Sequence, residues 1–182
     1  MRRVTVMFAV GVFVGGASAQ SLSPLPELGL WEERTQLLIN GKDLMAQLRE
    51  AQAAMLKNMP ANQRAAMEAD LKKATADTQR ECLTKEDAAE WRDPRKALAS
   101  MERESQCKFD LVNVSGSVLQ FKGRCKDPDG FTGDVAGNLT MAGSRAYTFS
   151  YSGKGRMAGA EGGGPVEMKM TSSARWVAAR CE

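Results

Sequence analysis

The chain has 182 residues, with 25 basic and 22 acidic side chains, four cysteines and no histidine. A net charge of +3 lacks the strong basic footprint of a dedicated nucleic-acid-binding protein, so we expect no nucleic-acid partner. The absence of histidine excludes Ser-His-Asp and Cys-His catalysis, H-E-x-x-H zinc sites and C-x-x-C-H haem attachment. We therefore expect no cofactor, and any catalysis would depend on carboxylates, lysine or tyrosine.

The N-terminus has the pattern of a cleaved export signal. Arg2 and Arg3 precede an apolar stretch over residues 4–14, and a run of small residues ends at Ala19. A membrane span needs about 20 apolar residues, more than this stretch supplies. We therefore predict a signal peptide over residues 1–19 with cleavage after Ala19. The mature chain is expected to be periplasmic or secreted, without stable insertion in a membrane.

The next part of the chain predicts an extended leader, a strand and a helical insertion. Residues 20–28 are expected to be extended, and residues 29–39 to form the first strand. A helical pattern follows over residues 43–76, with Asp43 as the N-cap. Its apolar residues recur at steps of three and four: Leu44, Leu48, Ala51, Met55 and Met59. Because Pro60 interrupts the pattern, the insertion is either a helical hairpin or a kinked helix.

The C-terminal half predicts a strand, a helix and then a series of strands. A short strand is expected over residues 78–83, and Thr84 caps a helix that ends near Arg92. Residues 95–105 are ambiguous between helix and loop. Strands are expected at 106–114, 117–125, 131–140, 145–157 and 166–177. The order predicts a single α+β domain over residues 29–182, with an antiparallel, strongly curved β-meander sheet and a helical insertion after the first strand.

The four cysteines predict two disulfides. Their spacings do not provide the close ligand pairs of a zinc site, and exported proteins oxidise their thiols. We hypothesise that Cys107 pairs with Cys125 and Cys82 with Cys181. The alternative joins Cys82 to Cys107 and Cys125 to Cys181.

The register of one predicted hairpin favours the first pairing. A three-residue loop over residues 115–117 places Cys107 opposite Cys125 and puts four apolar side chains on one buried face. These side chains are Phe109, Leu111, Leu119 and Phe121. The direction of the later strands then sends Cys181 to the other end of the sheet from Cys125, which leaves it for Cys82.

Several short motifs occur in a characteristic order along the chain. They are Gly29-Leu30-Trp31-Glu32, Met59-Pro60 with Gln63-Arg64 and Met67-Glu68, Cys82-Leu83-Thr84 with Glu86-Asp87-Ala88, Val114-Ser115-Gly116, Cys125 and the C-terminal Cys181. In order and spacing they resemble the exported bacterial family catalogued as domain of unknown function 3617. The resemblance covers nearly the whole mature chain. It implies a periplasmic or secreted bacterial protein and brings no catalytic residues to carry over.

The sequence predicts no active site. Glu32-Glu33 and Glu86-Asp87 are the acidic pairs to consider for acid–base chemistry. However, neighbours in a strand point to opposite faces, and acidic residues at a helix start interact with the helix dipole. Thioethers are ligands for Cu(I), but methionine also fills cores. The thioethers in question are those of Met157, Met168 and Met170.

Three hypotheses for function follow. The first is a non-enzymatic envelope module that binds a small apolar ligand or an envelope protein on the concave face of the sheet. The second is a histidine-free enzyme that uses carboxylates, and the third is a methionine-based Cu(I) handling protein. The candidate residues for the ligand face, each of which a core position explains equally well, are Trp31, Phe109, Leu111, Leu119, Phe121 and Tyr147.

Overall fold

The computed structural model describes residues 21–74, 76, 78–158 and 164–181. The predicted signal peptide over residues 1–19 lies outside the described residues, as does Gln20. In chain order the elements are β1 (Gly29–Ile39), β2 (Lys42–Asp43), α1 (Leu44–Lys57), α2 (Ala61–Ala74), β3 (Thr78–Leu83), α3 (Lys85–Trp91), α4 (Pro94–Glu104), β4 (Cys107–Ser115), β5 (Val118–Lys126), β6 (Phe131–Met141), β7 (Ala146–Met157) and β8 (Val166–Ala178).

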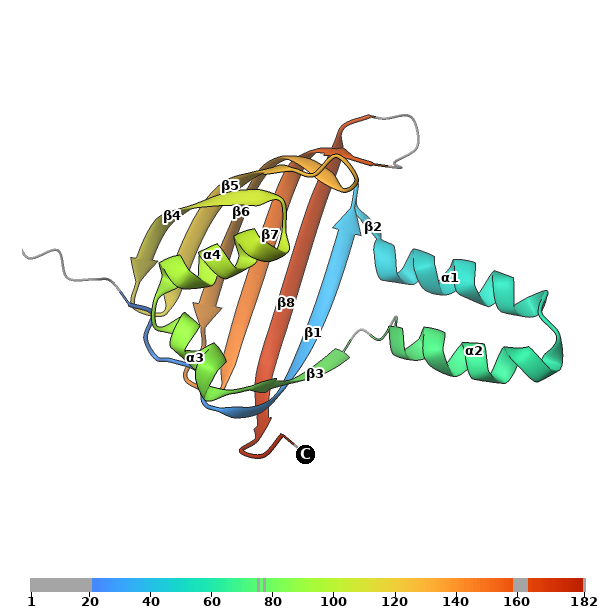
Figure 1. The fold of residues 1–182 in the computed structure, drawn as a ribbon, viewed down its shortest axis with the longest axis horizontal. Helices are drawn as coiled ribbons and strands as arrows, with labels where there is room; N and C mark the ends of the chain where they lie inside the picture. The colour runs from blue at the N-terminus through green and yellow to red at the C-terminus, as the bar shows by residue number, and fades with distance from the viewer. Residues whose placement is uncertain (1–20, 75, 77, 159–163, 182) are drawn as a thin grey trace, which may run out of the picture.

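The described strands form one eight-stranded antiparallel sheet in the order β2-β1-β8-β7-β6-β5-β4, with β3 also paired to β1. Strands β4 to β8 follow one another as a meander, and β8 pairs with β1 along nearly all of β1. The sheet is not closed, because β4 pairs only with β5. Figure 1 shows it curling around α3 and α4. The predicted α+β class and strongly curved antiparallel sheet are confirmed.

The alternation of side chains along the strands separates an apolar concave face from a polar outer face. Buried side chains of the concave face pack beneath α3 and α4, and Leu98 of α4 packs onto them. Those of β5 and β6 are Leu119, Phe121, Leu139 and Met141. The positions between them carry polar or small side chains toward the outer face, such as Gln120 and Asn138. The core therefore lies between α3–α4 and the concave face.

The segment before β1 is bound to the end of the sheet. Leu22 is buried in the core cluster. The backbone N–H of Ser23 donates to the carbonyl of Gly116 at 2.9 Å, and that of Glu27 donates to the carbonyl of Ser144 at 2.8 Å. These carbonyls belong to the β4–β5 and β6–β7 turns, so the segment runs along the turns at one end of the sheet.

Both hypothesised disulfides are present. Cys107 faces Cys125 across β4 and β5, with their Cα atoms 3.8 Å apart. Cys82, at the end of β3, is joined to Cys181, just beyond β8, across a Cα separation of 5.4 Å. The register argument for the hairpin and the count of strand directions therefore selected the right pairing of the three that four cysteines allow.

The loop of the β4–β5 hairpin differs from the predicted one. We expected three residues, 115–117, but β4 ends at Ser115 and β5 begins at Val118, which leaves a two-residue loop. Val112 has no partner in the pairing and forms a bulge. Val112 is 56% exposed, whereas Val114 is 2% exposed. The bulge thus turns Val114 into the core and restores the predicted register at the cysteines.

Capping residues set the starts of α3 and α4. The hydroxyl of Thr84 accepts the N–H of Asp87 at 3.3 Å, and the Asp87 carboxylate accepts the N–H of Thr84 at 3.0 Å. Residues 95–105, ambiguous in sequence, belong largely to α4. This helix begins at Pro94, where a proline is tolerated, and the Asp93 carboxylate accepts two backbone N–H groups of its first turn.

The insertion after β2 is a helical hairpin that extends away from the sheet, as Figure 1 shows. We call residues 44–74 the arm, and the sheet with α3 and α4 the lobe. Asp43 caps α1, as predicted, and accepts the N–H of Ala46 at 2.9 Å. No residue of α1 is buried: Leu48 is 40% and Met55 45% exposed. The predicted apolar stripe therefore forms without a covering partner among the described residues.

Candidate functional site

A half-open cavity of about 580 Å³ lies between α3–α4 and the concave face of the sheet. Its lining residues come from the N-terminal segment, helices α3 and α4, and strands β1, β3, β5, β6 and β7. Sites for small molecules usually have volumes of about 300–1,000 Å³. We call this space the inner cavity.

Apolar side chains form most of the inner cavity. They are Leu22, Trp91, Pro94, Ala97, Leu98, Met101, Leu119, Phe121, Leu139 and Phe149. The Phe121 ring stacks on Phe149 at a centroid distance of 6.2 Å, and Gly137 lies opposite Phe121 on β6. A Cβ at Gly137 would lie 2.5 Å from the Phe121 ring, so only glycine lets this ring lie across the neighbouring strand.

One end of the inner cavity is acidic. Glu33 of β1, Glu81 of β3 and Glu90 of α3 all line it. In the β1–β3 pairing Glu33 opposes Gln79, and Glu81 is two positions along, so both carboxylates project from the same face. The Tyr147 hydroxyl donates to Glu33 at 3.1 Å. Neutral donors therefore hold the Glu33 carboxylate, since the Thr35 hydroxyl also donates to it at 3.3 Å.

Tyr147 lies beside Glu33 and Glu81 at this acidic end. Burial raises the pKa of its hydroxyl above the usual value, and the negative charges of Glu33 and Glu81 raise it further. Tyr147 therefore remains a protonated hydrogen-bond donor at neutral pH. Its ring also contacts two indoles, with centroids 5.5 Å from Trp31 and 5.3 Å from Trp91.

The six residues predicted for the ligand face all lie on the concave face, but they have different roles. Leu119, Phe121 and Tyr147 line the inner cavity. Trp31 lines a smaller adjoining cavity of about 190 Å³ that shares Tyr147, Trp91 and Glu81 with the inner cavity. Phe109 and Leu111 pack against the core cluster without lining either space. Leu119 and Phe121 thus belong both to the core and to the cavity wall, whereas Phe109 and Leu111 belong to the core alone.

Sequence reasoning missed the acidic end and Trp91. One signal was available, because Glu33 shares the face of Trp31 by simple alternation. As expected, the two residues of Glu32-Glu33 point to opposite faces: Glu32 pairs with Arg80 and Arg175 on the outer face. The hydrogen bond from Arg175 lowers the pKa of the Glu32 carboxyl. Nothing in the sequence alone indicated that α3 would bring Glu90 and Trp91 over β1.

Comparison with family models identifies the family to which this chain belongs. The model described as Protein of unknown function (DUF3617) matches residues 24–181. The chain belongs to this family. Searches of curated proteins and of solved structures find no match. Family membership thus agrees with the resemblance found in the motifs and assigns no ligand to the inner cavity of this DUF3617 chain.

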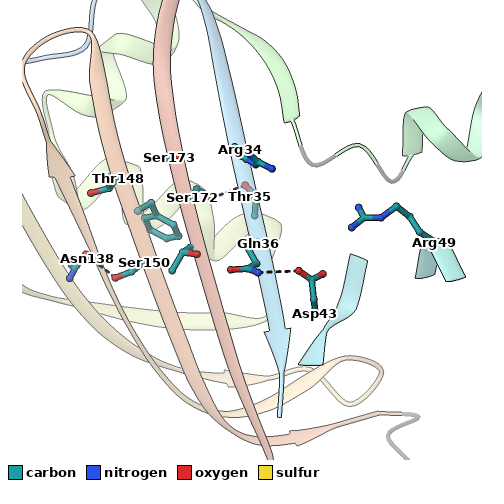
Figure 2. Close-up of a pocket in the computed structure, with 12 residues that line it drawn as sticks. Arg34, Thr35, Gln36, Asp43, Arg49, Asn138, Thr148, Ser150, Ser172 and Ser173 are labelled. Atoms are coloured by element: carbon teal, nitrogen blue, oxygen red, sulfur yellow. Dashed lines mark hydrogen bonds between the residues drawn. The ribbon is translucent and has the colours of Figure 1, made fainter. Parts of the chain in front are cut away.

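A second hollow, of about 570 Å³, lies on the outer face of the sheet beside α1 (Figure 2). Hydroxyl and amide groups line much of it. Several of them bind one another: Ser150 donates to Asn138 at 2.9 Å, and Gln36 donates to Asp43 at 3.1 Å. This hollow lacks the apolar wall of the inner cavity, so the inner cavity is the better candidate for the apolar ligand that the sequence suggested.

The strand register separates the three methionines considered for Cu(I). Met168 opposes Gly153 on β7, and Met157 lies four residues further along that strand. At about 3.3 Å per residue, this is about 13 Å along the sheet. Met157 is thus well separated from Met168 and Met170 along the sheet. The register therefore gives no support to a site in which all three thioethers bind one Cu(I) ion.

Proposed function

We propose that this protein is an exported, non-enzymatic binding module that holds a small, largely apolar ligand in the inner cavity. The observation that carries the proposal is the cavity itself: about 580 Å³ between α3–α4 and the sheet, with a wall of leucine, methionine and phenylalanine. Apolar pockets with a few convergent polar groups are the usual form of small-molecule sites. The leucines and rings provide burial, and the acidic end provides orientation.

Two disulfides and the N-terminal pattern support a location outside the cytoplasm. None of the described helices is long and apolar enough to cross a membrane. Export predicts that the mature protein begins at Gln20. Intact-mass measurement of protein recovered from its source should then show the loss of 19 residues, whereas a full-length mass would contradict this part of the proposal.

The binding proposal is tested with a neutral apolar dye, N-phenyl-1-naphthylamine, followed by its fluorescence. Ala97 of α4 lines the inner cavity, so Ala97→Trp should fill it and weaken dye binding by about tenfold or more. Ala99 lies exposed on the same helix, which makes Ala99→Trp the matched control with an expected change below about twofold. Equal affinity in both variants, or no binding to the native chain, would contradict the proposal.

The alternative in which the ligand is an envelope protein uses another surface. The arm extends away from the sheet (Figure 1) and exposes Leu48, Met55 and Met67, and none of its described residues lines the inner cavity. Native mass spectrometry of the protein purified from its source separates the two cases. A bound small mass that Ala97→Trp removes supports the cavity, and a bound protein that is lost with the arm supports the alternative.

The enzyme alternative uses the same acidic end. Its carboxylates line one cavity, which a histidine-free enzyme would require. Two of them already have partners, since Glu33 accepts two hydroxyl groups and Glu90 pairs with Arg103 at 3.8 Å. We therefore assign these carboxylates to binding. Chemical conversion of a co-purified ligand by the native chain, lost in Glu33→Gln, would support the enzyme instead.

A further inference from the structure

The charged groups that line the inner cavity are all of one sign. Glu33, Glu81 and Glu90 are acidic, and no lysine or arginine occurs among the described lining residues. The adjoining cavity repeats the pattern, with Glu81 and Asp87 and again no basic residue in the described part of its wall. The whole chain carries a net charge of +3, so this concentration of acid does not follow from composition.

Two of these carboxylates have no cationic partner within the part of the chain that the structure describes. Glu33 is held by the hydroxyls of Tyr147 and Thr35, which leave its charge uncompensated. Glu81 makes no ion pair with any described residue. Like charges in one partly enclosed site repel each other, and the repulsion is relieved when a cation enters.

Aromatic rings accompany these carboxylates. Tyr147 donates to Glu33, and its ring contacts the indoles of Trp31 and Trp91 at centroid distances of 5.5 and 5.3 Å. The faces of such rings attract ammonium and other organic cations, most strongly where water is partly excluded. Carboxylates and rings together therefore form the type of surface that recognises a cationic head group.

A bare metal ion fits this arrangement poorly. Among the described residues no three His, Cys, Asp or Glu side chains lie close enough to hold one. The carboxylates are instead distributed over β1, β3 and α3, in the wall of a largely apolar space. A larger cation with its charge spread over carbon-bound hydrogens fits this spacing, and its tail would extend along Leu98, Phe121 and Leu139.

We infer that the ligand of the inner cavity is an organic cation with an apolar tail, whose ammonium group binds among Glu33, Glu81, Trp91 and Tyr147. This inference rests on the proposed function, because it names the class of ligand for the same cavity. Anionic amphiphiles such as fatty acids are excluded by the same charges that attract the cation.

The test compares three amphiphiles with the same tail and different heads, each below its micelle concentration: decyltrimethylammonium, decyl maltoside and decyl sulfate. Calorimetric titration of the full-length mature chain should show the cation binding about tenfold more tightly than the neutral probe, and the sulfate most weakly. Added salt should reduce the difference, because part of it is electrostatic.

The matched variants are Glu33→Gln with Glu81→Gln, which keep the size of both side chains, remove their charge and replace one acceptor oxygen of each with an amide donor. They should lower the affinity for the cation about tenfold and change the affinity for decyl maltoside less than about twofold. Glu50→Gln, on the exposed surface of α1, is the control and should change neither.

The outcomes separate the two proposals. If all three probes bind equally and the double variant has no effect, the cation inference is wrong and the apolar cavity remains. If the sulfate binds most tightly, the inference is reversed in sign and fails. If no probe binds to the native chain at any concentration below its micelle concentration, both the inference and the proposed function are wrong.

Discussion

The two helix pairs of this protein have similar local signals and very different surroundings. Asp43 caps α1 and Asp93 caps α4, and each accepts backbone N–H groups of the first turn. Yet Leu98 of α4 packs against the apolar face of the sheet and is only 5% exposed. By contrast, α1 has no buried residue and Met55 is 45% exposed. Short helices gain most of their stability from tertiary packing. The lobe therefore carries the stability and the cavity, and the arm contributes little to either.

The largest expected effect comes from removing the disulfide that joins the end of β3 to the segment just beyond β8 in the lobe. Cys82 and Cys181 are 99 residues apart, so replacing both with serine should lower the free energy of unfolding by about 4–5 kcal/mol in the chain-entropy model. Cys107 and Cys125 are 18 residues apart, and their replacement should cost about 3 kcal/mol. Urea unfolding of the two double variants checks the order. A greater loss from the shorter loop would show that packing, not chain entropy, dominates.

A matched pair of truncations compares the lobe core with the arm. Phe121 is 2% exposed and lies in the main cluster, so Phe121→Ala should cost about 4 kcal/mol through lost burial and a new cavity. Met55→Ala should change the free energy of unfolding by less than about 0.5 kcal/mol. Both are measured by chemical denaturation. A loss above about 2 kcal/mol for Met55→Ala would mean that the arm is packed against another surface in solution.

Removing the N-cap of α4 in the lobe and of α1 in the arm should have smaller effects that also differ between the two regions. Asp93→Ala should lower global stability by about 1 kcal/mol, because α4 is part of the core. Asp43→Ala should instead increase hydrogen exchange in α1 while leaving the global unfolding free energy nearly unchanged. Hydrogen exchange followed by mass spectrometry measures both effects. Equal loss of protection in the lobe from the two variants would show that arm and lobe unfold as one unit.

The smallest expected effect comes from removing the arm. Replacing residues 44–74 with a flexible Gly/Ser linker should shift the melting temperature by less than about 4 °C and leave dye affinity within about twofold. The reason is that none of the described residues of the arm lines the inner cavity. Calorimetry and the dye titration provide the check. Loss of dye binding in this variant would assign the ligand to the arm and overturn the division of roles.

Only part of the candidate site could be predicted from the sequence. Alternation along β5 places Leu119 and Phe121 on the buried face, and the structure puts both in the cavity wall. Glu90 and Trp91 could not be placed, because their position depends on how α3 returns over β1. Ambiguity in residues 95–105 had the same origin: the contact of Leu98 with the sheet, rather than helix propensity alone, completes α4.

Features that depend on neighbours in the chain were determined by the sequence itself. The bounds of β1, the caps at Asp43 and Thr84, the helical character of the insertion and the disulfide between Cys107 and Cys125 all follow from periodicity, capping or hairpin register within short segments. The sequence left a helical hairpin and a kinked helix as alternatives for that insertion, and the structure shows the hairpin. These patterns work because side-chain direction repeats every 2 or about 3.6 residues along a regular backbone.

Other features were decided only by the tertiary structure. The pairing of β1 with β8, the place of β3 on β1, the bulge at Val112 and the meeting of Glu33, Glu81 and Glu90 join segments far apart in the chain or adjust one strand to another. No local period encodes such contacts. They arise because a curved sheet must cover its apolar face, and the pairing of distant strands and the helices over them bring carboxylates and rings into the wall of one cavity.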